Sequence, residues 1–258
     1  MPVLSAAHRG GRALADPLPV TNAILQQAGL VFRKGQFSLL AAAPGVGKSL
    51  WAMNLAIFTK VPTLFLSADS DEFTVVTRAT AVMTGHTINQ VTENMAQADW
   101  EEYYTSSLVP TSHIDWSYRT DIDAEYIANR ILAFEEMRGL LPSLIVIDNL
   151  DHTVEDENNE YVELRSICKA LQKLARDTGA HVMALHHVQG NKTKGNADIE
   201  MGDTLYKLEK IPELVLGLSR DGERSVTMTV PKNRTGRTGL RFALPLNYET
   251  ATFGGYTR

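Results

Sequence analysis

The sequence has a single cysteine and no excess of positive charge, and both absences narrow what the chain can do. Cys168 stands alone among 258 residues, which excludes an internal disulfide and a zinc site built from cysteines. We interpret Cys168 as a core residue, because it falls on the apolar stripe of a predicted helix. The formal net charge of -5 gives no overall attraction to nucleic acid. Any contact with DNA must therefore come from local basic loops.

Long apolar runs are absent as well. No uninterrupted apolar stretch is as long as a membrane span, and the first residues hold no apolar signal region. Hydrophobic residues nevertheless make up 44% of the chain, which is enough to bury a substantial core in one α/β domain. We therefore expect a soluble protein of the cytoplasm that has no membrane partner.

Residues 1–20 differ in composition from the rest of the chain. Residues 9–12 read Arg-Gly-Gly-Arg, and Pro17 and Pro19 follow, which is more typical of a tail than of a packed element. We predict a flexible N-terminal arm over residues 1–20 and one domain over residues 21–258. An arm that clasps a neighbouring subunit or touches nucleic acid is the alternative.

Residues 38–50 organise the rest of the chain, because they read as an apolar strand, a glycine-containing loop and the start of a helix. The loop departs from the strict phosphate-loop pattern G-x-x-x-x-G-K-[ST] at its first position, where Ala42 stands in place of glycine. The helix adds the positive end of its dipole at the same spot. A glycine-rich turn without a ligand is the alternative, but we predict a nucleotide site.

The residue types of this loop fit the chemistry of a phosphate chain. Gly45 and Gly47 allow backbone N–H groups to wrap the phosphates, and Lys48 supplies a positive charge for the β and γ phosphates. The Ser49 hydroxyl is a ligand for Mg²⁺. The predicted contacts with ATP are Ala43, Pro44, Gly45, Val46, Gly47, Lys48, Ser49 and Leu50.

Two predicted buried strands lead into a carboxylate. Residues 63–67 form an apolar strand shortly before Asp69, and residues 144–147 form one directly before Asp148. Ligands of open α/β sheets bind at the carboxyl ends of the strands, so both acids are expected beside the nucleotide. Asp148 is predicted to share the Mg²⁺ ion with Ser49, and Asp69 to polarise the attacking water. A role for the acids after residues 63–67 in starting the next helix is the alternative.

The segment that follows Asp148 is rich in acids. We interpret it as a solvated loop rather than a second metal site. Its acidic residues are Asp151, Glu155, Asp156, Glu157 and Glu160.

Adjacent histidines follow another buried strand, predicted over residues 182–185. Side chains alternate across a strand, so one of His186 and His187 should face the core and the other the nucleotide edge. A metal site would need further ligands, and no partner has the spacing for one. A sensor of the γ phosphate is the sharper interpretation. The next loop carries Lys192 and Lys194, the predicted contacts with a DNA backbone, with a mobile surface loop as the alternative.

Cations gather between glycines in residues 232–239. A solvated hairpin is one interpretation of this segment. The other is a cationic tip that reaches a neighbour's γ phosphate and stabilises the charge of the transition state.

The remaining periodic segments are predicted to be helices and short strands around these motifs. Thr21 is expected to cap a helix over residues 22–27, and Asp71 to cap the helix after Asp69. The aromatic residues between 100 and 116 are interpreted as packing residues rather than platforms for bases. Further helices are predicted over 100–104, 121–138 and 164–179, and strands over 113–116, 214–218 and 226–230.

In their order and spacing, these motifs resemble the RecA-like motor domain of DnaB-type replicative helicases over roughly residues 21–253. Residues 42–49 are similar to that family's phosphate loop, which also tends to begin with alanine. Residues 66–69 resemble the segment that presents the catalytic glutamate, here Asp69, and Arg78 falls where the family has an arginine in the following helix. Residues 145–148 resemble its Walker B strand.

The resemblance also implies roles for three further residues. His187 takes the place of the family's sensor glutamine, and an imidazole can still donate a hydrogen bond. Residues 232–236 look like the family's Lys-x-Arg-x-Gly finger. This implies that Lys232 and Arg234 act in trans, across a subunit interface.

The fold implied by the resemblance is an α/β, RecA-like P-loop NTPase with a mainly parallel central sheet and a C-terminal antiparallel hairpin. The implied activity is Mg²⁺-dependent ATP hydrolysis by a homo-oligomer, a hexamer or a filament, that moves on single-stranded DNA together with replication or recombination proteins. Family helicases carry an N-terminal helical domain, so we expect a compact motor core of the kind found in phages, which would act in the host cytoplasm. The alternatives are a RecA-like recombination or loading ATPase and a KaiC-like regulatory ATPase.

Overall fold

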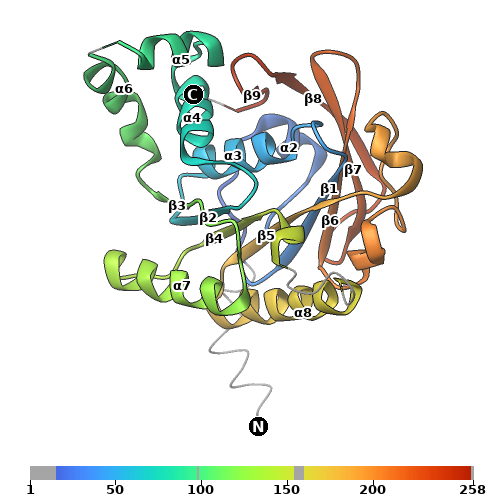
Figure 1. The fold of residues 1–258 in the computed structure, drawn as a ribbon. Coiled ribbons are helices and arrows are strands. Elements are labelled where there is room, and N and C mark those ends of the chain that lie inside the picture. Colours follow the sequence, from blue (N-terminus) through green and yellow to red (C-terminus); the bar gives the residue numbers. More distant parts are fainter. Residues whose placement is uncertain (1–15, 98, 154–159, 257–258) are drawn as a thin grey trace.

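A single mixed sheet with helices on both faces forms the protein (Figure 1). The computed structural model describes residues 16–97, 99–153 and 160–256. The strand order is β3-β2-β4-β5-β1-β6-β7-β8-β9. All pairs from β3 to β6 are parallel, and those from β6 to β9 are antiparallel. The predicted fold, a parallel centre with an antiparallel C-terminal part, is therefore confirmed.

The strands fall into these two groups along the chain. The parallel ones are β1 (Phe37–Ala42), β2 (Thr63–Ser67), β3 (Ile114–Ser117), β4 (Leu144–Asp148), β5 (His181–His187) and β6 (Leu214–Arg220). The antiparallel ones are β7 (Ser225–Asn233), β8 (Leu240–Asn247) and β9 (Thr252–Phe253). In register, Ala42 lies opposite His187 and Ser67 opposite Asp148, so the parallel strands end at one common edge.

Helices cover the two faces in separate groups (Figure 1). One face carries α2 (Ala23–Ala28), α3 (Lys48–Thr59) and α4 (Glu72–Thr84), with α5 (Ile88–Met95) and α6 (Trp100–Leu108) beyond them. The other face carries α7 (Ala124–Arg138) and α8 (Glu160–Thr178). Short 3₁₀ turns connect these elements: η1 (Val109–Thr111), η2 (Leu150–Thr153), η4 (Gly190–Lys194) and η5 (Leu205–Lys210). No helix among the described residues is both long and apolar enough to cross a membrane.

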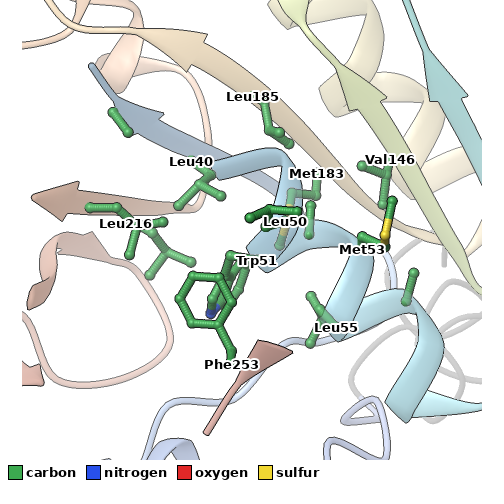
Figure 2. Packing of buried hydrophobic residues seen from close by; sticks show 14 of the residues in the cluster. Leu40, Leu50, Trp51, Met53, Leu55, Val146, Met183, Leu185, Leu216 and Phe253 are labelled. Atoms are coloured by element: carbon green, nitrogen blue, oxygen red, sulfur yellow. The ribbon is translucent and has the colours of Figure 1, made fainter. Parts of the chain in front are cut away.

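Helix α3 is buried on nearly all sides, which fixes its first turn at the end of β1. Figure 2 shows Leu50 and Trp51 of α3 among side chains of the sheet, including Leu40 from β1 and Phe253 from β9. Trp51 is fully buried and packs against Phe32, with ring centroids 5.9 Å apart. Fully burying one large apolar side chain contributes about 2–3 kcal/mol. The core thus holds the phosphate loop against the sheet edge.

Some boundaries differ from the sequence predictions. The cap of α2 is Asn22, whose Oδ1 accepts from two backbone N–H groups, whereas Thr21 donates its hydroxyl to the Phe58 carbonyl. Both residues are good caps, but Asn22 also donates to the Gly254 carbonyl at 2.9 Å, a contact that only the folded chain supplies. Helix α7 begins at Ala124 rather than at residue 121, after its cap Asp123.

Part of the predicted N-terminal arm packs on the domain. Leu18 is buried, and its N–H donates to the Phe32 carbonyl at 2.8 Å. Pro17 forms an isolated bridge with Arg33. Residues 1–15 of the arm lie outside the described residues.

Predictions about packing residues are confirmed. Cys168 is buried, and burial raises the pKa of its thiol to about 12. Tyr104 is fully buried, and the ring of Trp116 lies 4.7 Å from that of Phe65.

Candidate nucleotide site

The loop between β1 and α3 has the backbone of an anion-binding turn. Gly45 and Gly47 have φ angles of 72° and 106°, values that other residues rarely adopt. A Cβ atom on Gly47 would also lie only 3.2 Å from the Leu246 side chain. Gly47 caps α3 and has no side chain to accept the first N–H groups of the helix. These N–H groups are therefore left for a ligand, and the dipole of α3 favours an anion there.

A cavity of about 520 Å³ opens beside this turn. Its size falls in the range of ordinary ligand pockets. It joins the phosphate loop to residues from the segment after β2, from α4 and β5, and from the turn after β8. The lining residues are Pro44, Gly45, Gly47, Lys48, Ser49, Leu50, Asp69, Ser70, Arg78, His187 and Tyr248.

Lys48 and Asp148 are both buried and interact electrostatically. Burial lowers the pKa of Lys48, and the carboxylates of Asp148, Asp69 and Asp151 oppose this effect. Burial raises the pKa of Asp148 to about 6, although a hydrogen bond from Ser49 and the Lys48 charge act to lower it. Each group thus depends on the other for its charge.

The pair of Ser49 and Asp148 fits a hard cation. Asp148 is 1% exposed, and its Oδ1 has no hydrogen-bond partner among the described residues. A buried carboxylate oxygen without a donor, next to a serine hydroxyl, is an incomplete set of oxygen ligands. Mg²⁺ is held in this way in nucleotide sites, by one or two protein oxygens together with phosphates and water.

Asp69 and Arg78 approach the cavity from the segment after β2. The backbone N–H groups of Ala68 and Asp69 donate to the Asp148 carbonyl at 2.7 and 3.2 Å, which ties this segment to β4. Arg78 of α4 lines the same cavity and donates to the Ser70 hydroxyl at 3.4 Å. Asp71 caps α4 as predicted, because its Oδ1 accepts from the Thr74 N–H at 2.8 Å.

The two histidines of β5 have different surroundings, as the alternation of a strand predicts. His186 is fully buried, whereas His187 lines the cavity. Asp151 lies between them: its Oδ1 is 2.8 Å from His186 Nδ1, and its Oδ2 is 3.5 Å from His187 Nε2. The prediction that Asp151 belongs to a solvated loop is therefore wrong. Residues 155–157 of that acidic segment lie outside the described residues.

The two lysines of η4 have different surroundings. Lys192 is half-buried, donates to the Asp198 carbonyl and lies 3.4 Å from the Asp203 carboxylate. Lys194 is exposed. The turn that they share touches the nucleotide site, since a Cβ atom on Gly195 would lie 2.8 Å from the Val46 side chain.

Lys232 and Arg234 lie at the amino ends of the parallel strands, whereas the phosphate loop lies at their carboxyl ends. We call these two sides the amino edge and the carboxyl edge of the sheet. Asn233 pairs with Leu214 at the start of β6, and β6 runs parallel to β1. The length of β1 separates this edge from the phosphate loop by roughly 15–20 Å, at about 3.3 Å per residue. Neither residue can reach the nucleotide of its own chain.

Local contacts hold both cations at that edge. The Lys232 ammonium donates to the Glu209 and Lys210 carbonyls at 2.9 and 2.8 Å. Arg234 lies 3.6 Å from the Glu213 carboxylate, and its side chain is 48% exposed. Burial and the nearby Arg234 charge lower the pKa of Lys232.

Comparisons with known proteins agree with this geometry. A family model described as an AAA domain, AAA_25, matches residues 11–192. The chain belongs to this AAA domain family. The Gene 65 protein of Mycobacterium phage L5 is 32% identical over 231 residues, which cover 86% of this chain and 85% of that protein.

The AAA domain also resembles DnaB-type proteins. The replicative DNA helicase DnaB of Treponema pallidum (strain Nichols) is 24% identical over 81% of this chain, which spans about half (49%) of that helicase. A solved DnaB-like replicative helicase superposes with a TM-score of 0.79 over 98% of this chain and 64% of that one, at 16% identity. The predicted resemblance is thus confirmed, and the chain is a P-loop ATPase domain related to DnaB.

Sequence reasoning also missed Tyr248 and Arg220, which contact the phosphate loop of the AAA domain. Tyr248 lines the cavity, and its hydroxyl donates to the Val46 carbonyl at 3.1 Å. It sits in the turn after β8, and no local pattern marks it. Arg220 ends β6 and donates to the Gly45 carbonyl at 3.2 Å. The rule that selected the acids after β2 and β4 would have found Arg220, because it also follows an apolar strand of the parallel group.

Proposed function

We propose that this AAA domain is a Mg²⁺-dependent ATPase that drives a DnaB-like motor on single-stranded DNA during replication, in the cytoplasm. The observation that carries the proposal is the cavity in which Lys48, Asp69 and His187 meet around the phosphate loop, with the buried Asp148 carboxylate acting on Lys48. We further propose that the domain spans residues 21–258, with an N-terminal arm before it of which Pro17 and Leu18 pack on the domain. Its relation to DnaB favours a motor over a purely regulatory ATPase.

Each part of the site has a role in ATP hydrolysis under this proposal. The backbone from Ala43 to Leu50 and the Lys48 ammonium hold the phosphates. Ser49 and Asp148 hold Mg²⁺, which when bound neutralises charge on the β and γ phosphates. Asp69 orients the attacking water, as a carboxylate at the cavity can. His187 contacts the γ phosphate.

The base and sugar of ATP would lie toward the mouth of the cavity. Tyr248 is 36% exposed there. An aromatic ring at a half-open site is a stacking surface for a nucleobase. Its bond to the Val46 carbonyl would keep the ring beside the phosphate loop.

A second subunit would complete the site. Lys232 and Arg234 lie too far from their own phosphate loop to act there, but they are suited to a neighbour's γ phosphate in a hexamer or filament. Arginines supplied in trans stabilise the charge of a phosphoryl-transfer transition state. To reach that phosphate, Lys232 and Arg234 would have to break some or all of their contacts with the η5 carbonyls and with Glu213.

The turn that carries Lys192 and Lys194 would contact the DNA backbone. Lys194 is the exposed member, and Gly195 next to it packs on Val46 of the phosphate loop. A change in the conformation of the phosphate loop would therefore shift the turn that carries Lys192 and Lys194. Lys192 would hold the turn's shape through Asp198 and Asp203 in addition to any contact with phosphate.

The steady-state ATPase rate with and without single-stranded DNA, at low and raised salt, tests the proposal. Stimulation that falls with salt would support action on DNA, because phosphate contacts release counterions. A strand-displacement assay would then separate a helicase from a RecA-like recombination or loading ATPase. An intact ATPase that no DNA stimulates would contradict the proposed DNA motor and favour a regulatory ATPase.

A further inference from the structure

The hydrogen-bonding state of His187 follows from the side chain of Asn149, the residue directly after β4. Asn149 is 2% exposed. Its Nδ2 lies 3.3 Å from His187 Nε2, and its Oδ1 accepts from the Asp151 backbone N–H at 2.9 Å. The side-chain amide therefore bridges the turn after β4 and the end of β5.

The orientation of this amide is fixed. A flipped amide would put its NH₂ group against the Asp151 N–H, which can only donate. The oxygen therefore faces Asp151, and the NH₂ group faces the imidazole. A donor at this position requires an acceptor, so His187 Nε2 carries a lone pair and the ring proton sits on Nδ1.

The nearby carboxylate does not reverse this assignment. Asp151 Oδ2 is 3.5 Å from His187 Nε2, farther than Asn149 Nδ2 at 3.3 Å, and Asp151 Oδ1 is 2.8 Å from His186 Nδ1. Burial and the Lys48 charge lower the pKa of His187, against the raising effect of Asp151 and Asp69. A neutral ring with one proton is thus the favoured form.

The proton on Nδ1 is left without a partner by the described residues. His187 Nδ1 is buried and has no hydrogen-bond partner among the described residues. An unsatisfied buried N–H is unfavourable, and a phosphate oxygen in the cavity that His187 lines would satisfy it. A neutral histidine with the other tautomer would offer a lone pair, which repels phosphate.

We propose that Asn149 is a positioning residue that holds His187 as the Nδ1–H tautomer, so that the ring can donate to the γ phosphate of ATP. This inference rests on the proposed function of His187 as the phosphate sensor. Asn149 itself touches no phosphate under the proposal. It acts through the imidazole alone, as outer partners of functional histidines commonly do.

The tautomer can be read directly by ¹⁵N NMR of histidine-labelled protein without nucleotide. His187 signals are assigned by their loss in the His187→Gln variant. We expect a protonated Nδ1 and a bare Nε2 in the unsubstituted chain. In Asn149→Asp a carboxylate oxygen replaces the donor, and the proton should move to Nε2. A protonated Nε2 in the unsubstituted chain would overturn the proposal.

A double-mutant cycle on ATP turnover separates positioning from mere structure. Asn149→Asp should lower kcat at least about tenfold, the scale for losing a partner that orients a histidine, with ADP affinity retained. A glutamine at position 187 donates an N–H without any tautomer. In the His187→Gln background, Asn149→Asp should therefore lower kcat little further.

The cycle also removes the main side effect. The charge that Asn149→Asp places near Asp148 acts in both backgrounds, so it cancels. Equal losses in both would overturn the proposal and leave Asn149 a structural residue. If Asn149→Asp does not fold, Asn149→Leu, of similar shape without charge, replaces it in both experiments. An unsubstituted chain that fails to hydrolyse ATP would sink the proposed function, whereas the NMR result would still decide the tautomer.

Discussion

The two edges of the parallel sheet carry charges in different ways. At the carboxyl edge, the buried Lys48 depends on several carboxylates, and Asp148 Oδ1 has no partner among the described residues. At the amino edge, the Glu213 carboxylate is fully engaged. It accepts from Gln172 at 2.7 Å, Arg176 at 3.0 Å and the Phe37 N–H at 3.2 Å, and it lies 3.6 Å from Arg234.

This difference fits the two proposed roles, a binding site at the carboxyl edge and an interface element at the amino edge. Groups left unsatisfied in a buried place are stable only if a ligand completes them. The carboxyl edge is of this kind, with the free N-terminus of α3 and the Asp148 oxygen. The amino edge is already satisfied within one chain, and its finger residues are partly exposed. Such residues can exchange partners when a second subunit arrives.

The largest effect is expected from Lys48→Ala at the carboxyl edge. Removal of this cation leaves Asp148, Asp69 and Asp151 without their common counter-charge, and the phosphates without a ligand. We expect no measurable ATP hydrolysis and strongly weakened ATP binding in a phosphate-release assay and a binding titration. Lys169→Ala, an exposed lysine of α8, is the matched control. Residual turnover close to that of the control would rule out Lys48 as the phosphate ligand.

At the amino edge, Arg234→Ala should spare nucleotide binding but lower turnover by about a thousandfold, the lower end for an arginine supplied in trans. Arg176→Ala is the control, because Arg176 shares Glu213 but is not part of the finger. Unchanged turnover in Arg234→Ala would contradict the proposal that Arg234 acts on the nucleotide of a neighbouring subunit.

Mixed assemblies sharpen the result for Arg234. Arg234→Ala subunits combined with Asp69→Ala subunits should recover part of the activity, since some interfaces then pair an intact cavity with an intact finger. Size-exclusion chromatography must first show that both variants still assemble. A mixture no more active than its two components would speak for action within one chain.

The amino edge should also be the more sensitive of the two to acid. His181 is fully buried, its Nδ1 is 2.9 Å from the Arg33 carbonyl, and its Nε2 is 2.9 Å from the Ser38 hydroxyl. Burial lowers its pKa to about 4. Below its ordinary pKa of about 6.5 the unfolded chain binds a proton that the folded chain does not, so this stability is complete above pH 6.5 and is lost toward pH 4.

Urea unfolding at pH 7.5 and pH 5 measures this loss. At pH 5 the His181 contribution should fall by about 2 kcal/mol, from 1.5 pKa units. His181→Gln should show a smaller decrease between the two pH values, because glutamine does not titrate. An equal decrease in both proteins would mean that other groups cause the acid sensitivity.

What the sequence could predict depends on how local the signal is. Lys48 was predicted from the pattern of the phosphate loop. Asp69, Asp148 and His187 were predicted because each comes at or after the end of an apolar strand, and parallel strands end at one edge. The alternation of side chains along β5 predicted that one of His186 and His187 faces the nucleotide edge, and the resemblance to the helicase family indicated His187. These inferences do not require knowledge of how the strands and helices are ordered in space.

The contacts that sequence reasoning did not predict depend on pairings between distant segments. Asp151 meets His186 only because β4 and β5 are neighbours in the sheet. Tyr248 reaches the phosphate loop because the β8–β9 turn folds back over Val46. Local composition indicates a solvated loop for one and an ordinary turn for the other. Tertiary contact decided both, as it decided that Asn22 rather than Thr21 caps α2.

The smallest effect is expected from the exposed lysine of η4. Lys194→Ala should reduce the slope of log affinity for single-stranded DNA against log salt by about 0.7, the value for one lost phosphate contact. Lys173→Ala is the control, because that lysine is paired with Asp177 on α8. Fluorescence anisotropy with a labelled oligonucleotide over a series of salt concentrations gives both slopes. Because Gly195 packs on Val46, a true DNA contact should also make the slope differ between the ATP and ADP states. Identical slopes for Lys194→Ala and the control would place the DNA contact elsewhere, and the carboxyl edge would then bind nucleotide without contacting DNA through this turn.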